Sequence, residues 1–269
     1  MTALLTALDT ARQSYEQLGV IQVRGLIPAD EIDTLREVFT TQVETDPSLG
    51  HDDHLEADDV LRRYPRFVHP HRRPDTPAGQ LALRYLLDPR IFDVVEDLIG
   101  PAYAAQSMFY FKPPTARGQA LHQDNAFLQA HPETCVAAWI AVDDCDAENG
   151  ALSVVPGSHR IQLLCLEPAD DSLSLTNAKV PVPDGVKIEQ TEMKAGDVLF
   201  FHGSMVHGST PNSSADRFRR SLIFHYIPQS SVEVAKFYDP LITRAGDELS
   251  IAASADGGSC GEGWVSGPH

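Results

Sequence analysis

The stretch "LHQDNAF" (residues 121–127) places a histidine and an aspartate two positions apart in a mostly apolar run. Successive side chains of a strand alternate between its two faces, so His122 and Asp124 point the same way if this stretch is a strand. An imidazole and a carboxylate on one face are either an exposed polar pair or two ligands of a metal ion. Because such pairs are common on protein surfaces, this spacing alone does not decide between the two.

A metal site needs a third ligand, and "DVLFFHGSMVHGSTPN" (residues 197–212) offers two histidines. His207 follows Asp124 by 83 residues, whereas His202 ends the apolar run of the same segment. Two histidines and one carboxylate form the facial triad that holds non-haem Fe(II) and leaves coordination positions open. Spacing alone does not choose between His202 and His207.

An apolar segment that opens with two arginines, "FRRSLIFHYIP" (residues 218–228), follows the second histidine segment. Arg219 lies 12 residues after His207. A planar guanidinium binds a carboxylate through two parallel hydrogen bonds, which is what a dicarboxylate cosubstrate beside an iron site requires. The combination of triad and arginine is far more specific than either part.

With these motifs the sequence resembles the phytanoyl-CoA dioxygenase family of Fe(II)- and 2-oxoglutarate-dependent oxygenases. The resemblance covers roughly residues 15–230, and the order and spacing of its motifs make coincidence improbable. The shared motifs are "FKPP" (111–114), "HQD" (122–124), "WIAVDDCDAENGALSVVPGSH" (139–159), "AGDVLFFHGSMVHGSTPNSS" (195–214) and "RRSLIFHYIP" (219–228).

The resemblance implies that His122, Asp124 and His207 are the iron ligands. His202 is then expected either to pack on its strand or to support a ligand from behind. The arginine that anchors 2-oxoglutarate is less clear, because one residue more than usual separates it from the distal histidine. Counting back from the tyrosine of "FHYIP" selects Arg219 and leaves Arg220 as the alternative.

Three further residues are implied to contact the cosubstrate. Ser209 and Gln106 are placed to hydrogen-bond 2-oxoglutarate, and Lys112 to neutralise its carboxylates, although an exposed lysine is an equal alternative. His225 either lines the pocket or is a buried histidine bonded to a backbone carbonyl. Trp139 is expected in the core.

The implied reaction uses Fe(II), 2-oxoglutarate and O2, releases succinate and CO2, and hydroxylates a small-molecule metabolite or natural-product intermediate. Asp124 favours hydroxylation over halogenation, because related halogenases replace this carboxylate with a small residue. Desaturation, cyclisation and epimerisation use the same cofactors and stay open. So do a non-catalytic metal-binding sensor or scaffold and an isomerase or hydrolase with another metal, which would not need Arg219.

The elements that carry these residues are helices first and strands afterwards. Helical spacing runs through residues 2–18, 28–46 and 89–100, and from residue 103 short apolar runs alternate with turn signals. This order predicts one domain over residues 1–269, mainly β with flanking α-helices, and the resemblance implies a double-stranded β-helix, a cupin-like jelly roll. Residues 47–78 are expected to form an active-site loop, and residues 240–269 a loosely ordered tail.

The composition excludes several classes of partner. A net charge of −17 disfavours nucleic acid and anionic lipid surfaces, and no apolar run approaches the roughly 20 residues of a membrane span. Five of the 21 lysines and arginines lie in residues 61–75 with His69 and His71. This basic cluster is either a solvated loop or a positive rim for an anionic substrate.

The expected location is the cytoplasm. The N-terminus is predicted to be an amphipathic helix rather than a signal peptide. Four cysteines without a CxxC pair favour free thiols in a reducing compartment: Cys135, Cys145, Cys165 and Cys260. The oligomeric state is not indicated.

Overall fold

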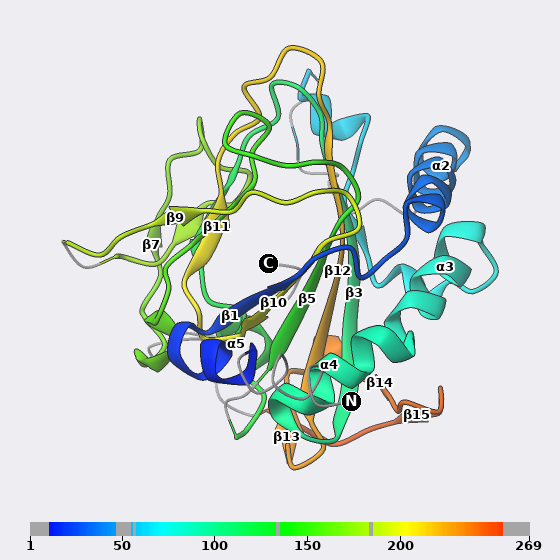
Figure 1. The fold of residues 1–269 in the computed structure, drawn as a ribbon, viewed down its shortest axis with the longest axis vertical. Coiled ribbons are helices and arrows are strands. Elements are labelled where there is room, and N and C mark those ends of the chain that lie inside the picture. Colours follow the sequence, from blue (N-terminus) through cyan, green and yellow to red (C-terminus); the bar gives the residue numbers. More distant parts are fainter. Residues whose placement is uncertain (1–10, 47–54, 56–57, 133–134, 183–184, 255–269) are drawn as a thin grey trace.

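The computed structural model describes residues 11–46, 55, 58–132, 135–182 and 185–254. Two antiparallel sheets pack against each other, and helices cover the opposite face of the larger sheet (Figure 1). This arrangement of antiparallel sheets with flanking helices agrees with the predicted class.

The larger sheet has eight strands among the described residues, in the order β1-β10-β5-β12-β3-β14-β15, with β2 also paired to β3. Its central strand β12 (Arg219–Pro228) is antiparallel to both of its neighbours. The other strands are β1 (Val20–Val23), β2 (Phe67–Val68), β3 (Ala102–Lys112), β5 (Val136–Ala141), β10 (Val198–His202), β14 (Leu241–Ile242) and β15 (Glu248–Leu249).

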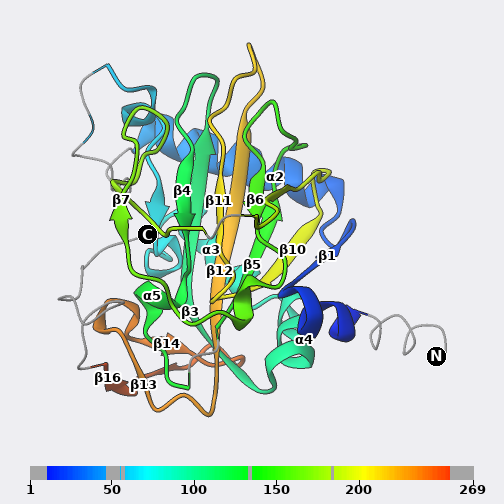
Figure 2. The ribbon, with the colours of Figure 1, turned by 90° about the vertical axis from the view of Figure 1, so that its left-hand side faces the viewer.

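The smaller sheet is made of short strands in the order β4-β11-β6-β9. These are β4 (Gln119–His122), β6 (Leu152–Val154), β9 (Glu189–Gln190) and β11 (His207–Ser209). Figure 2 views the molecule from the side on which this sheet lies. Two strand pairs lie outside both sheets: β7 (Glu167–Pro168) with β8 (Ala178–Lys179), and β13 (Glu233–Val234) with β16 (Ala252–Ala253).

The helices begin and end at residues with recognisable capping roles. The carboxylate of Asp88 accepts a hydrogen bond from the Arg90 amide at the start of α4, and Gly100, with φ of 77°, ends that helix. Residues 11–18 are also helical. The α-helices are α2 (Ala29–Thr45), α3 (Pro77–Leu86), α4 (Pro89–Ile99) and α5 (Asn125–Leu128), and the 3-10 helices are η2 (Val60–Arg62), η3 (Pro70–Arg72), η4 (Ser158–Arg160) and η5 (Lys236–Tyr238).

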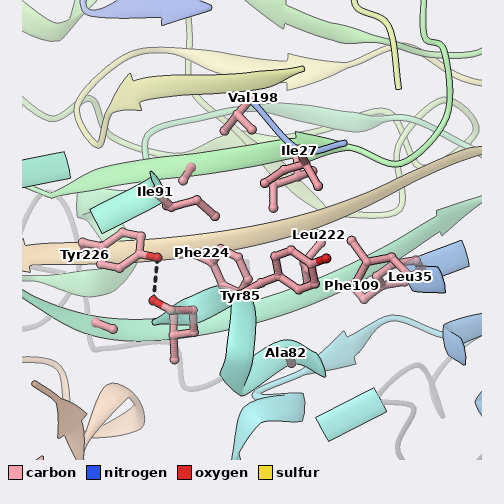
Figure 3. Close-up of a cluster of buried hydrophobic side chains, with 14 of the residues drawn as sticks. Ile27, Leu35, Ala82, Tyr85, Ile91, Phe109, Val198, Leu222, Phe224 and Tyr226 are labelled. Carbon is pink, nitrogen blue, oxygen red and sulfur yellow. Dashed lines mark hydrogen bonds between the residues drawn. The ribbon is translucent and has the colours of Figure 1, made fainter. Parts of the chain in front are cut away.

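The alternation of side chains along β12 divides the interior into two parts. Leu222, Phe224 and Tyr226 pack into the core between the large sheet and the helices (Figure 3). The hydroxyl of Tyr226 donates to the Leu86 carbonyl oxygen at 2.9 Å, which joins the sheet to α3. The intervening residues of β12 face the small sheet.

Several element predictions are confirmed and others need correction. The helices expected over residues 28–46 and 89–100 are α2 and α4, and strands follow residue 102. Of the helix expected over residues 2–18, residues 2–10 lie outside the described part of the chain, and α3 was not anticipated.

Short regular elements interrupt the second half of the expected active-site loop over residues 47–78. Phe67 and Val68 form β2 and pair with Phe109 and Met108 of β3. Phe67 is fully buried, so packing holds this segment in place despite its irregular polar composition. Residues 47–54 and 56–57 of the expected loop lie outside the described residues.

The expected tail over residues 240–269 is likewise not loose at its start. Leu241 and Ile242 are buried and form β14, which pairs with Ala104 of β3 and with β15. The Gly- and Ser-rich composition that motivated the expectation belongs to later residues, and residues 255–269 lie outside the described part of the chain.

Two other expectations concern membranes and thiols. No helix in the described ranges is both long and apolar enough to cross a membrane. Cys135 and Cys145 are free and buried, as expected. Cys165 is disulfide-bonded, so the expectation of four free thiols is wrong.

Candidate active site

The two histidines of the motif lie opposite each other in the small sheet. His122 ends β4 and His207 begins β11, and these two residues are paired in the ladder between the strands. Their ring centroids are 4.2 Å apart, and both side chains are buried. Strand pairing therefore brings together residues that are far apart in the sequence.

Asp124 reaches the same point by a different route from the expected one. The strand stops at His122, and Asp124 has helical dihedral angles (φ −60°, ψ −35°) at the start of α5. Strand alternation is therefore the wrong explanation, although the prediction that His122 and Asp124 point to the same place is correct. Its Oδ1 lies 3.5 Å from the Nε2 atom of each histidine, and the ligand atoms of the triad all lie within 4.8 Å of one another.

Backbone carbonyls fix the orientation of both imidazoles. The Nδ1 atom of His122 lies 2.8 Å from the Ala120 oxygen, and that of His207 lies 3.0 Å from the Met205 oxygen. Because a carbonyl only accepts, each Nδ1 carries the hydrogen, and each Nε2 presents its lone pair toward Asp124. This is the tautomer that a metal site requires.

His202 is not part of this group. Its ring packs against those of Tyr15 and His159, and its Nδ1 accepts a hydrogen bond from the Ser204 amide. Burial lowers the pKa of His202 to about 4, so it is neutral at physiological pH.

Arg219 lies in the same pocket as the triad. Its guanidinium is buried, donates to the Gly150 oxygen at 3.1 Å and to Ser221 Oγ at 3.0 Å, and lies over the Trp139 ring. Burial lowers the pKa of Arg219 to about 10, which leaves it charged at neutral pH.

Lys112 is the neighbour of Arg219 across the β3–β12 ladder. Its buried ammonium donates to Ser209 Oγ and to the Thr210 oxygen, both at 2.7 Å. Burial, together with the charge of Arg219, lowers the pKa of Lys112 well below its ordinary value. The alternative of an exposed lysine is wrong.

Arg220 points to the other face of β12. Its guanidinium forms two 2.8 Å contacts with the carboxylate of Asp143 and lies near Thr40 of α2. Strand alternation therefore places Arg219, and not Arg220, in the pocket.

Gln106 lies at the metal end of β3, opposite His225 and far along the strand from Lys112. Its side chain is fully buried, and its amide has no hydrogen-bond partner among the described residues. Its expected contact with 2-oxoglutarate remains a prediction.

Most of the apolar wall of the pocket was not predicted from the sequence. Trp139, expected in the core, is buried but faces the pocket, as do Met108, Tyr110, Leu152, Phe201 and Ile223. The face of the Arg219 strand was read as far as Ile223, and the same alternation back from Lys112 indicates Tyr110 and Met108. His225, left open between two roles, lies 3.0 Å from Asp124.

The sequence matches the family model for phytanoyl-CoA dioxygenase (PhyH) over residues 15–221. The chain belongs to the phytanoyl-CoA dioxygenase family. The family lies within the Fe(II)- and 2-oxoglutarate-dependent oxygenase superfamily, and the described residues contain a triad of one carboxylate and two histidines that could hold a metal ion.

Curated relatives of the chain come from plants and animals. Phytanoyl-CoA dioxygenase 1 of Oryza sativa subsp. japonica is 34% identical over 132 residues, which are 49% of this chain and 47%, about half, of the rice protein. The peroxisomal phytanoyl-CoA dioxygenase of Mus musculus is 27% identical over 240 residues, covering 80% of this chain and 67% of the mouse protein.

A solved structure shares the fold at low sequence identity. The epimerase SnoN, in complex with Fe3+, alpha ketoglutarate and nogalamycin RO, aligns with a TM-score of 0.69 and 21% identity, covering 94% of this chain and 97% of that chain. This likeness concerns the fold alone.

Proposed function

We propose that this protein is a dioxygenase that hydroxylates a small molecule, with conversion of 2-oxoglutarate to succinate and CO2, on a double-stranded β-helix. In this proposal His122, Asp124 and His207 hold Fe(II), and Arg219 anchors 2-oxoglutarate with help from Lys112 and Ser209. Iron, when bound, supplies the oxidising chemistry with O2.

The observation that carries the proposal is the pair of buried cations beside the triad. Within the described residues, the hydrogen-bond partners of Lys112 and Arg219 are neutral oxygens, and neither forms an ion pair with an acid. Buried charges in proteins are normally paired. Two adjacent cations without an acid therefore favour an anionic ligand, and Arg219 lines the same pocket as the triad that we propose the other end of this ligand to meet.

The protein's own contribution is to bind, orient and exclude water. Arg219 and Lys112 hold the distal carboxylate of the cosubstrate, while the Ser209 hydroxyl bridges to Lys112. Apolar side chains such as Trp139 and Ile223 line the space between the two ends and keep water from the reacting atoms.

The substrate is a small molecule in this proposal, and an anionic group on it is supported by one arginine of the basic cluster. Arg66 is buried and lies over the ring of Tyr110, which lines the pocket. Arg73 of the same cluster pairs with Asp75.

Access to the pocket is proposed to run past three segments joined by Arg117. Its guanidinium contacts the Asp59 carboxylate at 2.6 Å and the oxygens of Asp171 and Ser174. The expected active-site loop over residues 47–78 thus meets the segments that carry Arg117 and Ser174, and we propose that substrate specificity is set there.

Epimerisation is the second candidate outcome, because the structurally similar SnoN is described as an epimerase. The presence of Asp124 supports hydroxylation over halogenation but does not separate it from epimerisation. A cytoplasmic location belongs to the proposal as well, and the disulfide at Cys165 counts against the thiol argument for it.

The test is 2-oxoglutarate turnover by purified protein supplied with Fe(II), O2 and a panel of small molecules, measured as succinate release. Arg219→Met should abolish most of the turnover, and Arg220→Met is the matched control on the opposite face. Absence of succinate with any compound would favour the non-catalytic sensor or scaffold. Equal loss in both variants would count against Arg219 as the anchor.

A further inference from the structure

The two oxygens of the Asp124 carboxylate face different partners. Oδ1 lies 3.5 Å from the Nε2 atoms of His122 and His207, whereas Oδ2 lies 3.0 Å from Nε2 of His225. The side chains of Asp124 and His225 are each 1% exposed, so water does not compete for this contact. One oxygen thus faces the metal position, and the other faces a histidine outside the triad.

His225 reaches Asp124 from the opposite sheet. It lies on β12 between Ala137 of β5 and Gln106 of β3, on the face that carries Arg219. Asp124 lies in the turn after β4, in the small sheet. The contact therefore links the metal-binding turn to the central strand that also carries the proposed cosubstrate anchor.

The direction of the hydrogen bond follows from the chemistry of its partners. An ionised carboxylate only accepts, so Nε2 of His225 carries the hydrogen and donates it to Oδ2. A donor on this oxygen takes up lone-pair density that would otherwise be available to a cation. It also restricts rotation of the carboxylate group about its last side-chain bond.

We propose that His225 is a positioning residue that keeps Asp124 a one-oxygen ligand through Oδ1. This inference rests on the metal role proposed above for Asp124. A carboxylate that binds through both oxygens occupies two neighbouring coordination positions, and the second is one that 2-oxoglutarate or O2 needs. His225 thereby preserves the open side of the metal.

Three variants separate the hydrogen bond from packing. His225→Gln retains an amide donor with similar reach, whereas His225→Leu fills the space without a donor. Tyr226→Phe is the matched control, because it removes a different buried hydrogen bond from the next residue of the same strand, on the opposite face.

The measurement is titration of the metal-free protein with Co(II), followed by its visible absorption, since band intensity reports the coordination number. Outer-shell partners of metal ligands typically change metal affinity by about 10–100-fold. We expect His225→Leu to change the Co(II) affinity by a factor in that range and to weaken the visible band, because a second carboxylate oxygen raises the coordination number. His225→Gln should recover most of the wild-type affinity and spectrum, and Tyr226→Phe should match the wild type in both.

The outcomes separate this inference from the proposed function. If the wild type binds Co(II) and His225→Leu gives the same affinity and spectrum, the positioning role is wrong and the proposed function stands. If His225→Gln is as impaired as His225→Leu while Tyr226→Phe is normal, the hydrogen-bond account is wrong. If the wild type itself binds no Co(II), the proposed metal site fails first.

Discussion

At one end of the pocket, strands of three and four residues and a turn present the triad, whereas at the other end paired strands of ten and eleven residues present Arg219 and Lys112. Strands this short have few ladder hydrogen bonds, so they do little to fix the positions of the side chains of the triad. The triad end therefore depends on side-chain contacts: two imidazoles bonded to backbone carbonyls and Asp124 bonded to His225. The cation end depends on the register of the long ladder, which sets Arg219 opposite Lys112.

This difference predicts that single substitutions at the triad end have the larger effects. Asp124→Ala removes the one carboxylate of the triad, and we expect Fe(II) affinity to fall by more than the roughly 100-fold limit seen for outer-shell changes. Metal titration of the purified variant measures this. His202→Asn, outside the triad, should retain wild-type affinity, and a comparable loss there would contradict the ligand assignment.

At the cation end the expected effect is smaller and confined to the cosubstrate. Arg219→Met should weaken 2-oxoglutarate binding by about 10–100-fold, because a hydrogen bond to a charged group contributes roughly 1.5–3 kcal/mol. Fe(II) affinity should stay unchanged. The measurement is equilibrium binding of Fe(II) and of 2-oxoglutarate to Arg219→Met and Arg220→Met. A loss of Fe(II) binding in Arg219→Met would show that the two ends of the pocket are not independent.

Lys112 should give the cation end a pH dependence that the triad end does not share. Its pKa is lowered by burial and by Arg219, so the free protein loses this charge at a lower pH than an exposed lysine would. Because 2-oxoglutarate is a dianion, its binding favours the charged form of Lys112. Cosubstrate affinity should therefore fall as pH rises through the lowered pKa, with proton uptake on binding.

The matched variant for this pH dependence is Lys112→Met. It should bind 2-oxoglutarate about 10-fold more weakly at low pH, in line with one lost charged hydrogen bond, and its affinity should be nearly flat where the wild type declines. A decline of equal slope in both proteins would assign the titration to another group.

The smallest effect is expected outside the pocket. Tyr226→Phe removes the 2.9 Å hydrogen bond to the Leu86 oxygen on the helix side of β12. The unfolding free energy should fall by about 1 kcal/mol, measured by denaturant unfolding, while Fe(II) and 2-oxoglutarate affinities stay at wild-type values. A change in either affinity would show that the two faces of the strand are coupled.

The sequence allowed the triad and the arginine to be predicted because their residue types are rare in apolar strands and their order matches a known family. Counting back from Tyr226 favoured Arg219 and left Arg220 as the alternative, and the two faces of β12 in the structure place Arg219 in the pocket. These features depend on local pattern and on motif order.

Other features depend on contacts between distant segments, which periodicity does not encode. The turn at Asp124 looked like a continuing strand, because its helical dihedral angles arise where β4 ends and α5 begins. The strands β2 and β14 were missed because each has two residues and forms only by pairing, β2 with β3 and β14 with β3 and β15. The role of His225 was left open because its partner lies 101 residues away.

The central claim is that one pocket binds Fe(II) and 2-oxoglutarate together, with the triad at one end and Arg219 at the other. Anaerobic titration of the metal-free protein with both ligands tests it through the weak visible charge-transfer band of 2-oxoglutarate chelated to Fe(II). The account predicts this band in the wild type and in Arg220→Met, and a much weaker band in Arg219→Met at the same ligand concentration. Fe(II) binding without any band in the wild type would contradict the account.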